Sequence, residues 1–353
     1  MMRLILLLLA ALPVFAQCTG YGSHIPAQFQ AASGNIANYT AVISVTSKLL
    51  ATVANGGLSQ SAGFDICISD QINLVNFPLQ IRSYTATTGA LTAAVKVPGL
   101  AMAPTNVLVW IGKAGQSDPS TTAVWDANML AVYPLQETCT PGGSTAGCFK
   151  DATSGARHST GGVYPTQVSG VVGNAQSFAG AQTILMVNGL TTGTTSTISI
   201  WVKQAAHPVA DAYIWQTLAN ASSQGTLLGI KTTGFGMAYV NNVEQDGAVD
   251  LSDNGWHLLT ATQSVGPTAE TLYVDGVLIG TASGTFNGFT SGNARIGCCF
   301  GNGAPGNWFT GSVQEARYSN IVRSAAWVKA DYDSFHSPAT FFQLLPRVWG
   351  FTQ

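Results

Sequence analysis

The fold is decided by two stretches of this 353-residue chain, GWHLLTAT at residues 255–262 and ETLYVDGVLIG at residues 270–280. Leu272 and Val274 alternate with polar residues, as in a half-buried β-strand. Asp275-Gly276 follows them, and this pair adopts the left-handed dihedral angles that a two-residue hairpin turn needs. The pattern predicts one strand, a short loop, and then two strands joined at Asp275.

Similar β-rich runs separated by turn residues occur along most of the chain, and one segment alone favours helix. Ser324 is a suitable N-cap for a helix over 324–332. We therefore predict an all-β protein with two domains. The expected strands are Tyr39–Val45, Phe77–Tyr84, Ala93–Val97, Asn106–Ile111, Met129–Tyr133, Ser196–Val202, Leu227–Ile230 and Gly236–Val240.

The composition is unusually poor in charge. Charged residues make up 8% of the chain, with 39 glycines and a formal net charge of −2, whereas about 25% is typical of globular proteins. The chain has no cluster of Lys and Arg, which excludes an electrostatic nucleic-acid interface. A neutral, turn-rich β-protein is expected.

Residues 1–16 have the organisation of a signal peptide. Arg3 precedes an apolar core from Leu4 to Leu12, and small residues end at Ala16. The apolar run is shorter than the roughly 20 residues of a membrane span, and no later segment is a candidate span. Gln17 argues against a lipid anchor on Cys18. We therefore expect a secreted protein, extracellular or at the cell surface.

Six cysteines in an exported chain suggest three disulfides. Proximity favours pairing Cys139 with Cys148 across a Gly-rich loop, and Cys18 with Cys67. Cys298 and Cys299 are adjacent, so they either bond to each other or pair elsewhere. No Cys or His spacing typical of a metal site occurs.

The 255–280 signature resembles the LamG-like jelly-roll of the concanavalin A-like lectin and glucanase superfamily. Further segments, including Ala123–Leu135, Ile198–Lys203, Phe309–Ser319 and Arg323–Tyr332, resemble secreted bacterial proteins in which a small domain of unknown function precedes that jelly-roll. The signal-peptide pattern, the β-rich runs and a polar linker predict these boundaries: signal peptide 1–16, small β-sandwich 17–115, linker 116–123, a second domain at 124–335, which the resemblance implies is a jelly-roll, and tail 336–353. The aromatic tail is a candidate to pack back across the domain junction.

The resemblance also raises calcium as a cofactor, although this chain departs from the family at the relevant positions. Relatives carry acidic residues just after the position of Phe178, where this chain has residues 179–182 with the sequence AGAQ. Relatives often have Asp before Glu315, where this chain has Gln314. Because calcium takes six to eight oxygen ligands, several of them carboxylates, we expect part of any such shell to be lost.

Catalytic motifs are missing from the sequence. Glucanases of the superfamily place an E-x-D-x-x-E motif on one strand, and this chain has none. Glu244, Asp246, Asp250 and Asp253 lie among Asn and Gly, and we interpret them as a solvated loop. His257 is interpreted as a structural hydrogen-bonding residue. We expect a protein that is not an enzyme, with glycoside hydrolysis as the least favoured alternative.

Aromatic residues in irregular segments are the best indication of a binding site. Sugars present flat apolar faces beside hydroxyl groups, and ligand sites combine apolar walls with a few polar groups. We therefore predict a lectin-like protein that binds a polysaccharide or glycoprotein, with a structural or adhesive role as the alternative. The candidate ligand-binding residues are Phe300, Asn302, Asn307 and Trp308 in one loop, and Tyr213 and Trp215 in a second.

Overall fold

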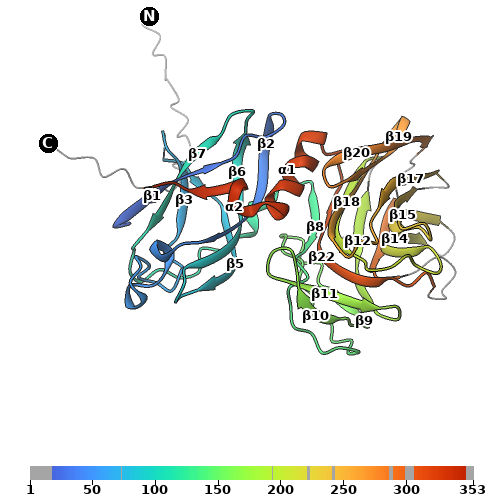
Figure 1. Cartoon of the computed structure of the whole chain (residues 1–353), viewed down its shortest axis with the longest axis horizontal. Coiled ribbons are helices and arrows are strands. Elements are labelled where there is room, and N and C mark those ends of the chain that lie inside the picture. The colour runs from blue at the N-terminus through green and yellow to red at the C-terminus, as the bar shows by residue number, and fades with distance from the viewer. Residues whose placement is uncertain are drawn as a thin grey trace, which may run out of the picture.

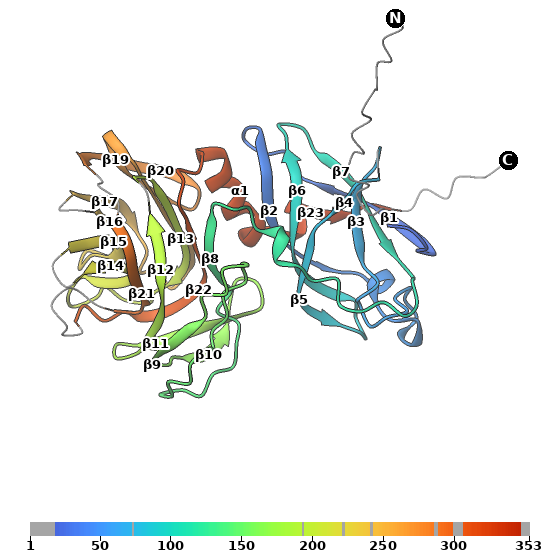
Figure 2. The ribbon, with the colours of Figure 1, turned by 180° about the vertical axis from the view of Figure 1, so that it is seen from behind.

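The structure is a computed structural model that describes residues 18–72, 74–192, 194–220, 223–240, 243–285, 289–298 and 306–346. Two β-domains lie side by side, with a helix between them (Figure 1). The same arrangement seen from behind shows strand β8 (Met129–Tyr133) lying in the junction (Figure 2). The predicted all-β architecture is confirmed.

The first domain is a small sandwich of two antiparallel sheets. One sheet has the order β23 (Phe342–Leu344), β1 (Ser23–Phe29), β7 (Thr105–Ile111), β3 (Cys67–Asp70) and β4 (Asn76–Phe77). The other has the order β2 (Ile36–Thr46), β6 (Ala90–Leu100) and β5 (Leu79–Thr85). Short 3₁₀ helices η1 (Lys48–Leu50), η2 (Val53–Asn55) and η3 (Thr122–Val124) lie in the connections.

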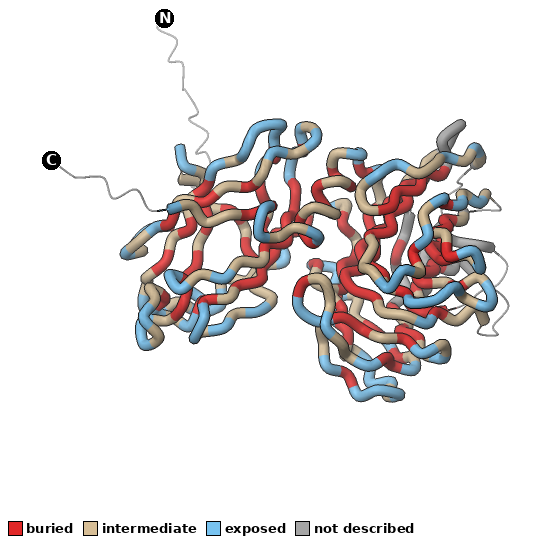
Figure 3. Tube along the Cα trace, viewed as in Figure 1, coloured by how far each residue is buried: buried red, intermediate tan, exposed pale blue. Residues whose placement is uncertain are grey.

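The strand pattern explains the core of this domain. Ile25, Ala27 and Phe29 alternate along β1, and all three are fully buried against the second sheet. The intervening side chains face outward, as the two-residue period of a strand requires. Figure 3 shows this burial along the inner strands of both domains and at the junction.

The second domain is a larger sandwich. One sheet has the order β10 (Thr166–Ser169), β11 (Asn174–Ala179), β22 (Thr310–Ser319), β13 (Ser196–Lys203), β18 (Trp256–Gln263), β19 (Val265–Val274) and β20 (Val277–Thr285), and β8 also pairs with β22. The facing sheet has the order β17 (Val243–Asp250), β16 (Phe235–Val240), β15 (Ser223–Ile230), β14 (Ala212–Asn220), β21 (Phe289–Ile296), β12 (Thr183–Thr192) and β9 (Ser159–Val163).

The hairpin that decided the fold forms as predicted. Asp275 and Gly276 both have positive φ, 53° and 77°, which matches a two-residue turn between twisted strands. The Asp275 carboxylate accepts a hydrogen bond from the backbone N–H of Leu258 and contacts the His257 ring, at 2.9 Å and 2.8 Å. His257 therefore fastens the turn to strand β18, as the structural interpretation predicted.

The C-terminal segment returns to the first domain. Helix α1 (Ala325–His336) begins at Ser324, whose side chain accepts a hydrogen bond from the N–H of Trp327, so the predicted cap is confirmed. After α2 (Pro338–Phe341), strand β23 pairs with β1, and Phe342 is buried against Phe29. Residues 342–344 of the predicted tail therefore complete the first domain's sheet, and the tail packs back across the domain junction.

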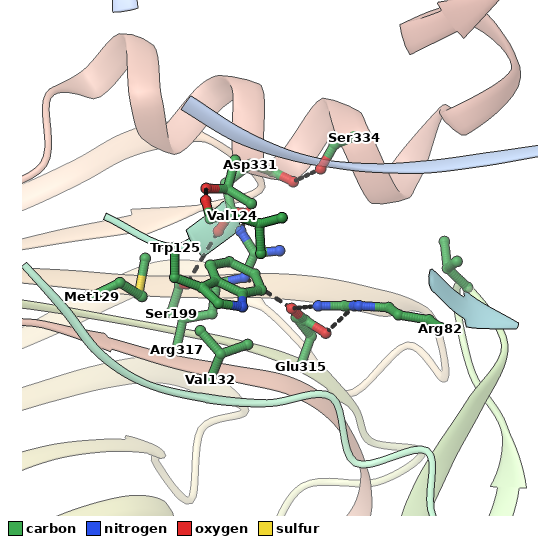
Figure 4. A network of polar contacts seen from close by, with 12 residues as sticks. Arg82, Val124, Trp125, Met129, Val132, Ser199, Glu315, Arg317, Asp331 and Ser334 are labelled. Carbon is green, nitrogen blue, oxygen red and sulfur yellow. Dashed lines mark hydrogen bonds and ion pairs between the residues drawn. The ribbon is translucent and has the colours of Figure 1, made fainter. Parts of the chain in front are cut away.

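The junction between the domains contains a buried network of charged side chains (Figure 4). Arg82 of β5 makes two hydrogen bonds to Glu315 of β22, at 2.7 Å and 2.9 Å. Glu315 also contacts Arg317, which pairs with Asp331 of α1. The guanidinium groups of Arg82 and Arg317 both lie near the Trp125 ring. Each domain thus supplies groups that the other neutralises.

The backbone at Glu315 adopts an unusual conformation to reach this position. Its φ of 49° is in the left-handed region, which is uncommon for a residue with a side chain. The bulge it forms in β22 shifts the register with β13. Burial alone would raise the pKa of Glu315, but the nearby Arg82 and Arg317 hold that pKa below its usual value. The carboxylate is therefore ionised and paired, and it joins the two domains.

The two disulfides inferred from proximity are both present. Cys18 bonds to Cys67 and Cys139 bonds to Cys148. Cys298 is also disulfide-bonded, and Cys299 lies outside the described residues. Within the described part of the chain, no helix has the length and apolar character to cross a bilayer.

Candidate functional site

A pocket of about 570 Å³ opens on the jelly-roll where the β13–β14 connection faces the start of β22. Such a volume suits a small-molecule ligand or one unit of a larger one. The lining residues are Gly180, Gln204–Ala210, Asn307, Trp308, Thr310 and Gly311. Two of these, Asn307 and Trp308, are among the residues that the sequence suggested as ligand contacts.

Two hydrogen bonds bring the two candidate segments together. The side-chain amide of Asn307 donates to the carbonyl of Asp211 at 2.7 Å, and the N–H of Tyr213 donates to the carbonyl of Asn307 at 2.9 Å. Asn307 has a φ of 52°, and Asn tolerates this left-handed region better than most residues. Asn307 therefore positions the half-buried Trp308 beside the β13–β14 connection.

Gln204 forms another part of the pocket wall. It is almost fully buried at the end of β13, and its side-chain amide donates to the carbonyl of Ala206. Its backbone carbonyl accepts from Asn254. The Oε1 atom of Gln204 is buried and has no hydrogen-bond partner. These contacts hold the 204–206 turn in place, so that the following residues, His207 and Pro208, line the opening.

His207 is the one ionisable residue among the described residues that line the pocket. Its Nε2 lies 2.9 Å from Oδ2 of Asp250, and each side chain is about half exposed, at 52% and 51%. Hydrogen bonds from His207 and from the backbone of Ser252 lower the pKa of Asp250 below its usual value. The Asp250 carboxylate is therefore ionised at neutral pH.

A cluster of acidic residues surrounds Lys231 on the neighbouring strands. The ammonium group lies 3.2 Å from Asp211, 2.5 Å from Glu244 and 4.0 Å from Asp246. Partial burial would lower the pKa of Lys231, but hydrogen bonds to Glu244 and Asp211 raise it above its usual value. Partial burial, together with Glu244, raises the pKa of Asp246.

The sequence predicted a solvated loop for the acidic residues from Glu244 to Asp253, and this prediction is wrong for most of them. Glu244, Asp246 and Asp250 lie on β17, and Asp253 alone follows it in a connection. Strand β17 is the edge of its sheet, and charged residues are common on edge strands because they discourage pairing with another chain. The acidic residues that we interpreted as part of a loop among Asn and Gly are therefore compatible with an edge strand.

The six residues predicted to contact a ligand have different environments in the structure. Asn307 and Trp308 line the pocket, and Tyr213 is half-buried beside Asn307. Trp215 is fully buried and stacks on Tyr318 inside the sandwich. It was expected at the surface with Tyr213, but a bulge between the two residues turns Trp215 inward. The remaining two, Phe300 and Asn302, lie outside the described residues.

Sequence reasoning missed Gln204 and Asp250 as parts of this site. His207 belongs to no recognised sequence motif, and its partner Asp250 is 43 positions away from it. The sequence offers one weak indication of this site: polar Gln204 follows the β13 strand, and His207 comes soon after it in a connection rich in Ala and Pro. The partner on β17 required the three-dimensional structure.

The positions considered for calcium are occupied by amide groups that bond to the backbone. Oε1 of Gln314 accepts from the N–H of Val171 at 2.7 Å, and its Nε2 donates to the carbonyl of Val172. Oε1 of Gln182 accepts from the N–H of Ala179 at 2.6 Å. Because calcium sites need several carboxylates, this donor set does not fit the ion. Among the described residues, no group of three or more His, Cys, Asp and Glu is placed to hold a metal.

The comparison with protein-family models supports the fold of the second domain. Residues 178–329 match the family model described as the concanavalin A-like lectin/glucanases superfamily. The second domain is thus a concanavalin A-like jelly-roll, as the resemblance implied. No curated protein matches the chain.

Solved structures similar to the chain include binding domains and enzymes. Domain 4 of AbnA, a GH43 extracellular arabinanase from Geobacillus stearothermophilus solved with arabinotriose, is 16% identical with a TM-score of 0.43, over 60% of this chain and 100% of that one. The binding domain of Paraclostridial Mosquitocidal Protein 1 is 13% identical with a TM-score of 0.45, over 59% and 52%. Trypanosoma rangeli sialidase is 11% identical with a TM-score of 0.45, over 67% and 42%. These similarities carry no conclusion about ligand or activity.

Proposed function

We propose that this chain is a secreted, non-catalytic protein whose jelly-roll binds a glycan in the pocket at Trp308. The observation that carries the proposal is the convergence of an aromatic side chain with Asn307 and His207 around one opening. An indole face packs against the apolar face of a sugar ring, and nearby amide or imidazole groups bond to its hydroxyls. The ligand is a polysaccharide or the glycan of an extracellular glycoprotein.

Several features support secretion and the lack of catalysis. The disulfides fit an oxidising compartment, and the N-terminal sequence has the signal-peptide pattern. The carboxylates of Glu244 and Asp246 are engaged by Lys231, whereas a glycoside hydrolase needs two carboxyl groups that flank a bound sugar. Release of reducing sugar by the pure protein would overturn the non-catalytic part of the proposal.

A glycan and polysaccharide array tests the binding role. The oxidised full chain is applied with calcium and with a chelator, beside Trp308→Ala and the matched control Trp110→Ala, a half-buried Trp in the first domain. We expect selective binding by the wild-type chain and by the control, and loss of binding in Trp308→Ala with an unchanged melting temperature. Unchanged binding by Trp308→Ala would remove this pocket as the site.

A structural or adhesive role is the second candidate, and the buried junction favours it. A network that locks two sandwiches together through Arg82 and Glu315 suits a rigid spacer as well as a binding protein. Incorporation of the chain into purified extracellular assemblies, with no binding on the array, would favour this role.

A further inference from the structure

His207 and Asp250 form a built pair at the rim of the pocket, because the turn beneath them leaves room for both side chains. Gly234 has a φ of 81°, and a Cβ added there would lie 2.3 Å from Oδ1 of Asp250 and 2.9 Å from the His207 ring. Any larger residue would displace the pair. Oδ1 of Asp250 also accepts from the N–H of Ser252 at 2.9 Å, so the carboxylate is fixed in position.

The ionised carboxylate determines how the His207 ring presents itself. A carboxylate can only accept hydrogen bonds, so Nε2 of His207 carries the proton that bonds to Asp250. In the neutral ring, Nδ1 is then an acceptor. A sugar hydroxyl in the pocket can donate to this atom, whereas a carboxylate or sulfate ester of a sugar has no proton to donate.

The charges around the opening act in the same direction. The described residues that line the pocket include no Lys, Arg, Asp or Glu. The Asp250 carboxylate pairs with His207, and the ammonium of Lys231 is surrounded by the carboxylates of Asp211, Glu244 and Asp246. The ionised Asp250 carboxylate therefore places a negative charge beside the lining residue His207, where it disfavours an anionic ligand.

We propose that the pocket selects neutral sugars and rejects sugars that carry carboxylate or sulfate groups, with Asp250 as the residue that determines this selectivity. The inference rests on the proposed glycan-binding function and adds the chemical class of the ligand. Asp250 acts in two ways: it fixes the ring of His207 as a hydrogen-bond acceptor, and it supplies the negative charge. The effect of its charge should weaken with salt, because half-exposed charges are screened over a distance of about 10 Å at 0.1 M ionic strength.

The test uses pairs of related sugars, one neutral and one acidic. Binding of the oxidised full chain is measured with tetragalacturonate and its methyl ester, with sialyllactose and lactose, and with xylotetraose carrying or lacking a glucuronic acid. The variants are Asp250→Asn, which keeps the shape of the side chain, and Asp118→Asn, which removes an exposed charge next to the first domain.

We expect the wild-type chain to bind at least one neutral sugar more tightly than its acidic counterpart. Asp250→Asn should reduce that preference about fivefold at low salt, the size of effect that one charge exerts at a partly solvated distance of a few ångströms. Asp118→Asn should leave the preference unchanged, and high salt should reduce it in the wild-type chain.

The outcomes separate this inference from the function on which it rests. If no sugar of either charge binds, the proposed glycan-binding function fails and the selectivity fails with it. If sugars bind at Trp308 but the acidic member of each pair binds as well as the neutral one, the function stands and the selectivity is refuted. Equal preference in Asp250→Asn and the wild-type chain would likewise refute the role of Asp250.

Discussion

Replacing Arg82 with Met removes one side of the buried ion pair that crosses the domain junction. The side chains of Arg82 and Glu315 are 5% and 1% exposed, so solvent cannot replace the lost partner. Breaking a buried pair in this way costs about 3–5 kcal/mol. Glu315 retains Arg317 at 3.0 Å, and we therefore expect a loss of about 3 kcal/mol in the free energy of unfolding, the lower end of that range. Met keeps an unbranched apolar stem in place of that of Arg82.

Urea unfolding of the oxidised chain, followed by Trp fluorescence, measures this loss. The double variant Arg82→Met/Glu315→Gln should be more stable than Arg82→Met, because it removes the uncompensated charge and leaves Arg317 paired with Asp331. As a control, Lys329→Met breaks a more exposed pair with Asp333 and should cost less than about 1 kcal/mol. A loss below about 1 kcal/mol for Arg82→Met, or a double variant less stable than the single one, would refute this account of the junction.

Three further predictions concern stability. Burial raises the pKa of Glu270 from 4.5 to about 8. Its contribution to the free energy of unfolding is therefore complete below pH 4.5 and is lost as the pH rises to about 8. Glu270→Gln should abolish this decrease of stability with pH, measured by thermal melts at a series of pH values. Hydrogen bonding to Asp275 raises the pKa of His257 from 6.5 to about 9, so stability should also fall between those pH values, and a His257→Gln variant whose pH profile matches the wild type would contradict the assignment. Phe342→Ala should cost about 3–5 kcal/mol, seen in the urea transition of the first domain, whereas a tail that merely lies on the surface would give no change.

Much of the fold could be predicted because it depends on local chemistry. The Asp275-Gly276 turn, the Ser324 cap and the alternating strands are set by neighbours in the sequence. The two disulfides followed from proximity along the chain. These features can be predicted without knowing which sheet each strand joins.

The rest depends on contacts between distant residues. The burial of Trp215 follows from a bulge that interrupts strict alternation, and the pairing of β23 with β1 joins the two ends of the chain. Glu315 was identified only as a family position, yet it is a centre of the junction, because Arg82 comes from the other domain. At the candidate site, Trp308 was predicted because it is an aromatic residue in an irregular segment. His207 and Asp250, in contrast, come into contact only because β17 lies beside the β13–β14 connection.

The central claim is that a glycan binds against Trp308, and the indole N–H signals of the chain test it most directly. The chain has eight Trp residues, and comparison with Trp308→Ala assigns the signal of Trp308 in a nitrogen-15 correlation spectrum of the oxidised protein. Titration with a neutral sugar that scores on the array should shift the Trp308 signal and leave that of the buried Trp201 in place. A bound sugar that shifts other indole signals but leaves that of Trp308 unmoved would contradict the account.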